Sequence, residues 1–297
     1  MAAQGGAAPM PDYLAFTALE DGTFTLTIGS GVKPADLSYI EYSVDGTNWV
    51  RTDNVTSTTV TITTPTITSG DKVYWRGKGS KCAINRNNSA NASIFTSTGR
   101  FNASGHIMSL LKGELAEDSN TLSDDYSFVR LFYGNTNIVD ASELIVASNV
   151  TQRCYEQMFE GCSELTEPPQ LPCTTVATGC YFGMFNKCKK MVDAPILPSE
   201  TLAGVCYYNL FRDCTTLRYI VMLATDISAS QCMAAWVAGM TDTSEFVFVK
   251  HIDATWDVVN INGTLSNWTI IYYDPSTDKY YLSDKTTECD DHGNVIN

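Results

Sequence analysis

The stretch CYFGMFNKCKKM, residues 180–191, decides the fold of this chain. Two cysteines stand eight residues apart in it, with Met184 and Phe185 between them. Related segments follow at a step of 26 residues: CYEQMFEGCSEL from residue 154, CYYNLFRDCTTL from 206 and CMAAWVAGM from 232, with a diverged SFVRLFYGNTNI from 127. Self-similarity at a fixed period of about 20 to 50 residues indicates a repeat architecture in which neighbouring units stack.

Each unit is predicted to contain one short helical segment and one short strand. Cys180, Met184 and Cys188 fall at i, i+4 and i+8, which is the spacing of one face of an α-helix. The segment LRYIVML, residues 217–223, has the β-branched and apolar composition of a buried strand. Because one unit cannot bury its own apolar side, the units are expected to stack as a solenoid over residues 127–249.

Seven cysteines fall in two columns of this repeat, and stacking is expected to turn each column into an interior ladder: Cys154, Cys180, Cys206 and Cys232 form the first, and Cys162, Cys188 and Cys214 the second. Paired strands of successive units are expected about 4.8 Å apart. A free thiol behaves as a small apolar side chain there, which is the interpretation we favour. The separation also suits disulfide geometry, so spacing alone leaves oxidation open. Zinc is disfavoured, because Cys-x7-Cys does not gather thiols around one ion and no histidine accompanies it.

A tyrosine follows the first cysteine in three units, at Tyr155, Tyr181 and Tyr207. Two interpretations of this column are open. The rings form a stacked structural ladder, or they form a strip that binds a sugar or a protein, since tyrosine is enriched in contact surfaces. We favour the ladder and keep the binding strip as the alternative.

Upstream of the repeats the apolar pattern has a period of two. TFTLTIG from residue 23 alternates apolar residues with threonines, and YIEYSVDGTNWV from residue 39 alternates around an Asp45-Gly46 turn signal. TTVTITT from residue 58 and KVYWRG from residue 72 repeat the pattern. Short strands with turns between them predict an immunoglobulin-like β-sandwich over residues 12–100. The small-residue arm before it, residues 1–11, is expected to lie against a partner.

The remaining segments are expected to close the two ends of the solenoid. Residues 101–126 form the junction and the cap of the first unit, and residues 250–297 form a C-terminal cap with a β-hairpin. The hairpin turn is predicted at DPSTD, residues 274–278. Its alternating oxygens also suggest a calcium loop, but the glycine and the distal glutamate of such a loop are missing. The predicted fold class is mainly β with short helices.

The charge of the chain limits its partners. The 297 residues include 33 acidic and 19 basic ones, which gives a formal net charge of −14. Such a field repels phosphate backbones and anionic membrane surfaces, so nucleic acid is not an expected partner. The basic run Lys187, Lys189 and Lys190 is interpreted as a solvated face. We find neither a secretory signal at the start nor a run of 18 apolar residues, so no membrane span is expected.

Catalysis has little support in the sequence. The histidines, His106, His251 and His292, lie in separate segments without HExxH, GxSxG or a glycine-rich phosphate loop. A polysaccharide depolymerase would need two carboxylates across a groove, and no spacing indicates such a pair. We therefore expect no enzyme, no metal and no cofactor.

LPSETLAGVCYYNLFRDCTTL, which begins at residue 197, resembles the BspA-type leucine-rich repeats of gut Bacteroidales surface proteins and of the crAss-like phages that infect them. YLAFTALEDGTFTLTI from 13, STGRFNASGHIMSLLKGE from 97 and GTLSNWTII from 263 look like the flanks of those repeats. The resemblance implies a leucine-rich-repeat solenoid that follows an immunoglobulin-like domain. It indicates the architecture and the habitat of the protein more than its activity. The sequence departs from the pattern at both ends of the array, where Ser127 and Met240 replace cysteine.

The resemblance and the missing secretion signal together predict a phage virion structural protein. We expect a capsid decoration or head-fibre type protein that is assembled in the host cytoplasm and displayed on the outer surface of the particle. Other virion proteins are the expected partners, through residues 1–11 or the sandwich, in a homo-oligomer or larger assembly. Adhesion to a glycan or another host-surface ligand is a further expectation. The alternative is a BspA-type adhesin on the bacterial cell surface.

Overall fold

The computed structural model describes residues 12–29, 38–53, 60–78, 92–115, 120–240, 246–256 and 268–296. The predicted arm at residues 1–11 lies outside this part of the chain, as does Cys82. Strands make up 33% of the structure and helices 3%, so the predicted mainly β class is confirmed. The one α-helix among the described residues is α1, Ser109–Lys112.

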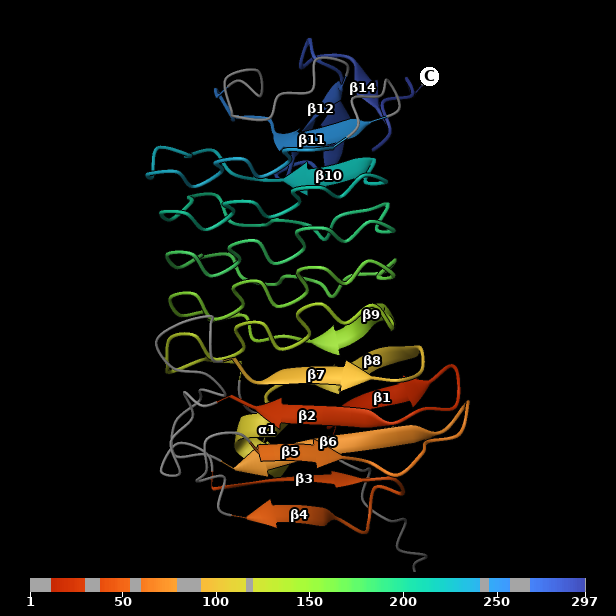
Figure 1. The fold of residues 1–297 in the computed structure, drawn as a ribbon. Coiled ribbons are helices and arrows are strands. Elements are labelled where there is room, and N and C mark those ends of the chain that lie inside the picture. The colour runs from red at the N-terminus through yellow and green to blue at the C-terminus, as the bar shows by residue number, and fades with distance from the viewer. Residues whose placement is uncertain are drawn as a thin grey trace, which may run out of the picture.

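Two facing sheets form the lower part of the molecule in Figure 1. Their strands are β1 (Leu14–Ala18), β2 (Phe24–Ile28), β3 (Tyr39–Ser43), β4 (Val50–Asp53), β5 (Val60–Thr63), β6 (Lys72–Lys78), β7 (Ile94–Ser97), β8 (Phe101–His106) and β9 (Ile138–Ile145). The larger sheet has the order β4-β3-β6-β1-β8-β9, and the smaller one β5-β2-β7. In β2, Phe24, Leu26 and Ile28 are buried, because successive side chains of a strand point to opposite faces. The rings of Phe16 and Phe95 meet between the sheets at 5.0 Å, so the core lies there.

Both sheets continue into the repeat region. β9 pairs in parallel with β8, which carries the larger sheet across the predicted junction at residues 101–126. On the smaller sheet, the amide of Phe95 donates to the carbonyl of Leu131 at 2.7 Å. The junction also contains α1 and the 3-10 turn η2 (Gly113–Leu115). The facing sheets and the repeats are therefore joined by shared strands rather than by a free segment.

The repeat units lie on top of one another, as the layers in the middle of Figure 1 show. Every second amide of a unit donates to a carbonyl of the next unit: Tyr155 to Cys180 at 2.9 Å, Gln157 to Phe182 at 2.8 Å and Phe159 to Met184 at 2.9 Å. The amides between them close four-residue turns within the unit, as Met158 does on Tyr155 at 3.2 Å. Backbone hydrogen bonds thus form both within each layer and between neighbouring layers.

These segments are chains of turns, so the helix predicted from the cysteine spacing is wrong. Gly179, Gly183 and Lys187 have φ of 62°, 58° and 64°, and the equivalent residues of the other units are also left-handed. They occupy the third position of alternate turns, where a type II turn requires a positive φ. The turns repeat every four residues, which leaves Cys180 and Cys188 both buried. The i, i+4, i+8 pattern therefore reflects a period of four, not one of 3.6.

The upper end is a curled sheet of β10 (Tyr219–Met222), β11 (Val247–His251), β12 (Thr269–Asp274), β13 (Lys279–Tyr281) and β14 (Glu288–Cys289). β10, β11 and β12 pair in parallel, and β12, β13 and β14 are antiparallel. The strand predicted at residues 217–223 and the hairpin around residues 274–278 are both present. In that turn Asp274 accepts hydrogen bonds from Ser276 Oγ at 2.6 Å and from Thr277 Oγ1 at 3.0 Å. The alternating oxygens therefore close a turn.

One apolar core runs from the facing sheets to the upper end. A column of phenylalanines forms its centre, with centroids 5.2 to 5.9 Å apart: Phe132, Phe159, Phe185 and Phe211. Phe95 continues the column below, 5.8 Å from Phe132, and Trp236 continues it above, 6.4 Å from Phe211. The lower and upper parts of the molecule thus share one packed interior.

Candidate functional site

The seven cysteines of the two predicted ladders are buried, and none forms a disulfide. In the second column each thiol donates to a carbonyl of the preceding unit: Cys162 to Phe132 at 3.0 Å, Cys188 to Phe159 at 3.2 Å and Cys214 to Phe185 at 3.0 Å. The contact gives a weak S–H donor an acceptor in a place that water does not reach. The thiols of both columns lie inside the stack.

Burial also controls the acidity of these thiols. It raises the pKa of Cys206 and of Cys214 to about 12, and it raises the pKa of Cys180 and of Cys188 well above the ordinary thiol value. The thiolate is the form that attacks electrophiles and binds metals, so protonated thiols in this position are chemically inert. Among the described residues, no group of three or more His, Cys, Asp or Glu is placed to hold a metal ion.

The tyrosine column lies inside the stack as well. Tyr155, Tyr181 and Tyr207 are at most 1% exposed, and their rings stack with centroids 5.9 and 6.2 Å apart. A ligand in solvent does not reach rings in this position, so burial excludes the binding strip that we kept as the alternative. The Tyr155 hydroxyl accepts a hydrogen bond from the Ala147 amide at 2.9 Å. The buried Tyr207 hydroxyl has no partner among the described residues.

Two aromatic side chains that reach the surface stand one residue after the tyrosine column. Phe182 and Tyr208 are partly exposed, and their rings stack at 4.8 Å with planes 3° apart. The guanidinium of Arg153 lies 5.5 Å from the Phe182 ring. The sequence offered a signal for this pair, since an aromatic residue stands two places after the cysteine in two adjacent units.

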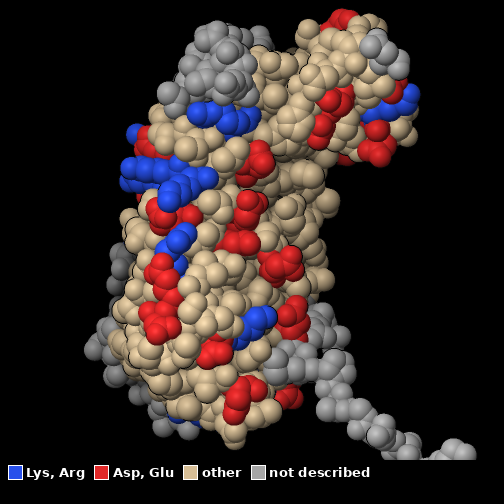
Figure 2. Space-filling model, turned by 90° about the vertical axis from the view of Figure 1, so that its right-hand side faces the viewer, with Lys and Arg blue, Asp and Glu red and all other residues tan. Residues whose placement is uncertain are grey.

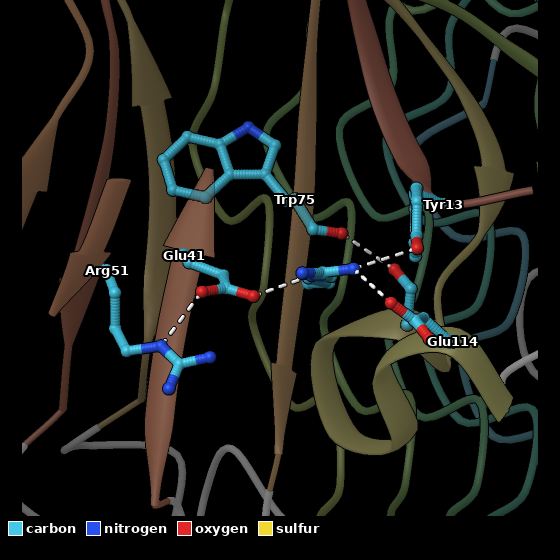
Figure 3. A network of polar contacts seen from close by, with 7 residues as sticks. Tyr13, Glu41, Arg51, Trp75 and Glu114 are labelled. Atoms are coloured by element: carbon cyan, nitrogen blue, oxygen red, sulfur yellow. Dashed lines mark hydrogen bonds and ion pairs between the residues drawn. The ribbon is translucent and has the colours of Figure 1, made fainter. Parts of the chain in front are cut away.

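A polar network crosses the outer face of the larger sheet (Figure 3). Glu41 on β3 is 2% exposed and lies between two arginines, 2.9 Å from Arg51 Nε and 2.6 Å from Arg76 Nε. Strand register explains the arrangement, because Glu41 is paired with Arg51 of β4 on one side and with Arg76 of β6 on the other. Arg76 Nη1 also donates to the Tyr13 hydroxyl at 2.9 Å and to Glu114 at 2.8 Å.

The surroundings keep this network charged and paired. Burial disfavours the charge on Arg76, but hydrogen bonds to Glu41 and Tyr13 outweigh it and raise the arginine pKa. Burial raises the Tyr13 pKa, so the phenol stays protonated. The indole of Trp49 covers the Arg76 guanidinium at 3.8 Å. The network links three strands, β3, β4 and β6, to η2 and to Tyr13 just before β1, and its members are hydrogen-bonded or ion-paired to one another. Sequence reasoning missed it, because cross-strand register cannot be read from the residues alone.

Two lysines of the basic run pair with acids of the preceding unit. Lys190 Nζ lies 2.7 Å from Glu164, and Lys187 Nζ lies 3.8 Å from Glu160. Figure 2, which faces one side of the stack, shows basic and acidic side chains interleaved along it. These lysines form a solvated face with ion pairs between layers.

The three histidines stand on separate elements. His106 ends β8 and His251 ends β11; both are buried, and each accepts a hydrogen bond from the amide two residues on. His292 is exposed near the C-terminal end, 2.7 Å from Asp291.

Comparison with known proteins gives no match: neither a protein-family model nor a curated protein nor a solved structure matches the chain. Within the described part of the chain, no helix has the length and apolar character that crossing a membrane requires.

Proposed function

We propose that the chain is a structural and display protein of a phage particle, of the capsid-decoration or fibre type, in which an immunoglobulin-like sandwich is fused to a BspA-type leucine-rich-repeat solenoid. The observation that carries the proposal is the unbroken connection between the two parts. β8 pairs with β9, and Phe95 of the smaller sheet packs against Phe132 of the first unit at 5.8 Å. The molecule is therefore built as one rigid spacer.

A spacer of this kind suits display. Strand order and unit stacking place roughly ten spacings of about 4.8 Å between β4 and β12, which extends the molecule by about 50 Å. A protein anchored at one end holds the other end away from the surface that carries it. We place the anchor at the sandwich end, because β4 is the outermost strand of its sheet and Val50 on it is 53% exposed.

The cysteines favour a phage component over an exported adhesin. Nine cysteines among the described residues are buried and free. Proteins that pass through an oxidising compartment usually carry disulfides, whereas proteins assembled in the cytoplasm keep their thiols reduced. Phage particles assemble in the cytoplasm of the host, so reduced and buried thiols agree with that route.

Mass spectrometry of purified particles tests the proposal. Particles released from a lysed host are purified on a density gradient, and their proteins are digested and sequenced. We expect peptides of this chain at a stoichiometry fixed relative to the major capsid protein. Their absence from particles, together with their presence in the surface fraction of a bacterium, would refute the proposal in favour of the adhesin. A chain without residues 1–11 tests whether the arm or the sandwich is the anchor.

A further inference from the structure

A groove lies on the outer face of the larger sheet, at the place where the facing sheets meet the repeats. Its volume is about 370 Å³, and its lining includes Asp12, Lys72, Ser104, Gly105, Glu143 and Ile145. A second hollow of about 430 Å³ shares Asp12 and Ile145 with it and adds His106 and Asn120.

The strand register explains why the sheet is hollow there. One row across the outer face runs from Ala15 on β1 through Ser104 on β8 to Glu143 on β9. On β6 the groove is lined by Lys72, which lies on the same face two residues before Tyr74, the partner of Ala15. The two central strands contribute small side chains and the two flanking strands contribute long ones. β6 and β9 are three strand spacings apart, about 14 Å, so the row forms a trough with a floor and two walls.

Gly105 keeps the floor low. It has a φ of 74°, and a Cβ at this position would lie 2.0 Å from the carbonyl oxygen of Tyr13. Any other residue would displace the start of β1, which is held here by a hydrogen bond from the His106 amide to the Asp12 carbonyl at 2.9 Å. The close approach of the two backbones thus brings Asp12 to the edge of the groove.

We propose that this groove binds a neutral glycan. Its lining alternates acceptors, Asp12 and Glu143, with a cationic donor, Lys72, and with the hydroxyl of Ser104, which both donates and accepts. Vicinal sugar hydroxyls also donate and accept at every position, so they match such a lining. Ile145 is 42% exposed and offers an apolar contact for the C–H face of a sugar ring.

Other ligand classes fit the groove less well. The lining residues carry two carboxylates and one amine, and the chain carries a net charge of −14, so sialylated or sulfated glycans and nucleic acids are repelled. Ile145 is the one aliphatic side chain of the lining, which leaves an apolar peptide little surface to bury. The inference deepens the proposed display function by naming a ligand class, and its biological meaning rests on that function.

The test uses the purified full chain and a glycan array. The array carries neutral hexose and N-acetylhexosamine oligosaccharides beside their sialylated and sulfated forms, and calorimetry then measures the affinity for the strongest neutral ligand. We expect binding to neutral forms. Glu143→Gln removes a charged acceptor and is expected to weaken binding about tenfold. Ser104→Trp fills the floor and is expected to abolish binding. The matched control is Glu167→Gln, which changes an exposed glutamate in the next unit and is expected to leave the affinity unchanged.

The inference is overturned if the folded chain binds no neutral glycan, if it binds only the charged forms, or if the groove variants bind as well as the control. Lys72→Gln, at an exposed position of β6, replaces Ser104→Trp if the tryptophan variant does not fold. The result is independent of the particle analysis. A chain that is present in particles but binds no glycan refutes this inference alone, whereas a glycan-binding chain that is absent from particles refutes the display function alone.

Discussion

The tyrosine column predicts opposite effects for one and the same substitution. Tyr155 and Tyr207 occupy equivalent positions, are fully buried and stack against neighbouring rings. Their hydroxyls differ, because that of Tyr155 accepts a hydrogen bond from the Ala147 amide and that of Tyr207 has no partner among the described residues. A buried polar group without a partner costs about 1 to 3 kcal/mol. Tyr207→Phe removes this cost and leaves a void of one oxygen atom, so we expect it to stabilise the protein by about 1 kcal/mol.

Tyr155→Phe has the reverse effect. It leaves the Ala147 amide, which is fully buried, without its acceptor, so we expect a loss of about 1 to 3 kcal/mol. Urea unfolding of the two variants and the parent chain measures both values. Equal slopes of the unfolding free energy against urea concentration show that the unfolded states are comparable. Phenylalanine keeps the ring stack in both cases, so each variant controls for the other. A Tyr207→Phe variant as destabilised as Tyr155→Phe would refute this account of the column.

Three further predictions follow from the structure. A water-soluble thiol reagent is expected to modify none of the nine described cysteines in the native chain and all of them in denaturant, as read by peptide mapping; rapid native labelling of a ladder cysteine would contradict the packing. Glu41→Gln leaves two arginines without their shared carboxylate, and we expect it to lower the free energy of unfolding by about 3 kcal/mol. This value is at the lower end for a broken buried ion pair, because Arg51 keeps solvent contact. The control, Glu20→Gln, lies at an exposed position and is expected to change the free energy of unfolding by less than about 0.5 kcal/mol. Gly105→Ala is expected to destabilise more than Gly70→Ala: both residues have a positive φ, which costs about 1 kcal/mol for alanine, but only Gly105 also meets a backbone oxygen. Equal melting temperatures for the two glycine variants would argue against that close approach.

The sequence allowed some of these features to be predicted and hid others for physical reasons. The step of 26 residues and the apolar positions within it were visible, because stacked layers need the same side chain at the same place. The helix was a wrong prediction, since three residues spaced by four fit a period of 3.6 nearly as well as a period of four. Glycines at residues 134, 161, 183 and 239 recur at the left-handed positions. They are the sequence signal that distinguishes four-residue turns from an α-helix.

The surface features were less accessible to prediction. The pairing of Glu41 with two arginines depends on which residues lie opposite one another in neighbouring strands. The groove depends on four strands at once, including β9, which follows β8 only after the junction segment. Neither arrangement leaves a periodic pattern along the chain, so both required the three-dimensional structure.

The amides that join successive units have a mechanical consequence. Their hydrogen bonds point along the stack, so a pull between the two ends loads them lengthwise and separates one layer boundary at a time. Bending loads the molecule differently, because it must compress the packed layers on one side of the phenylalanine column while it separates those on the opposite side. The molecule is therefore expected to resist sideways drag while yielding, layer by layer, to tension between its two ends.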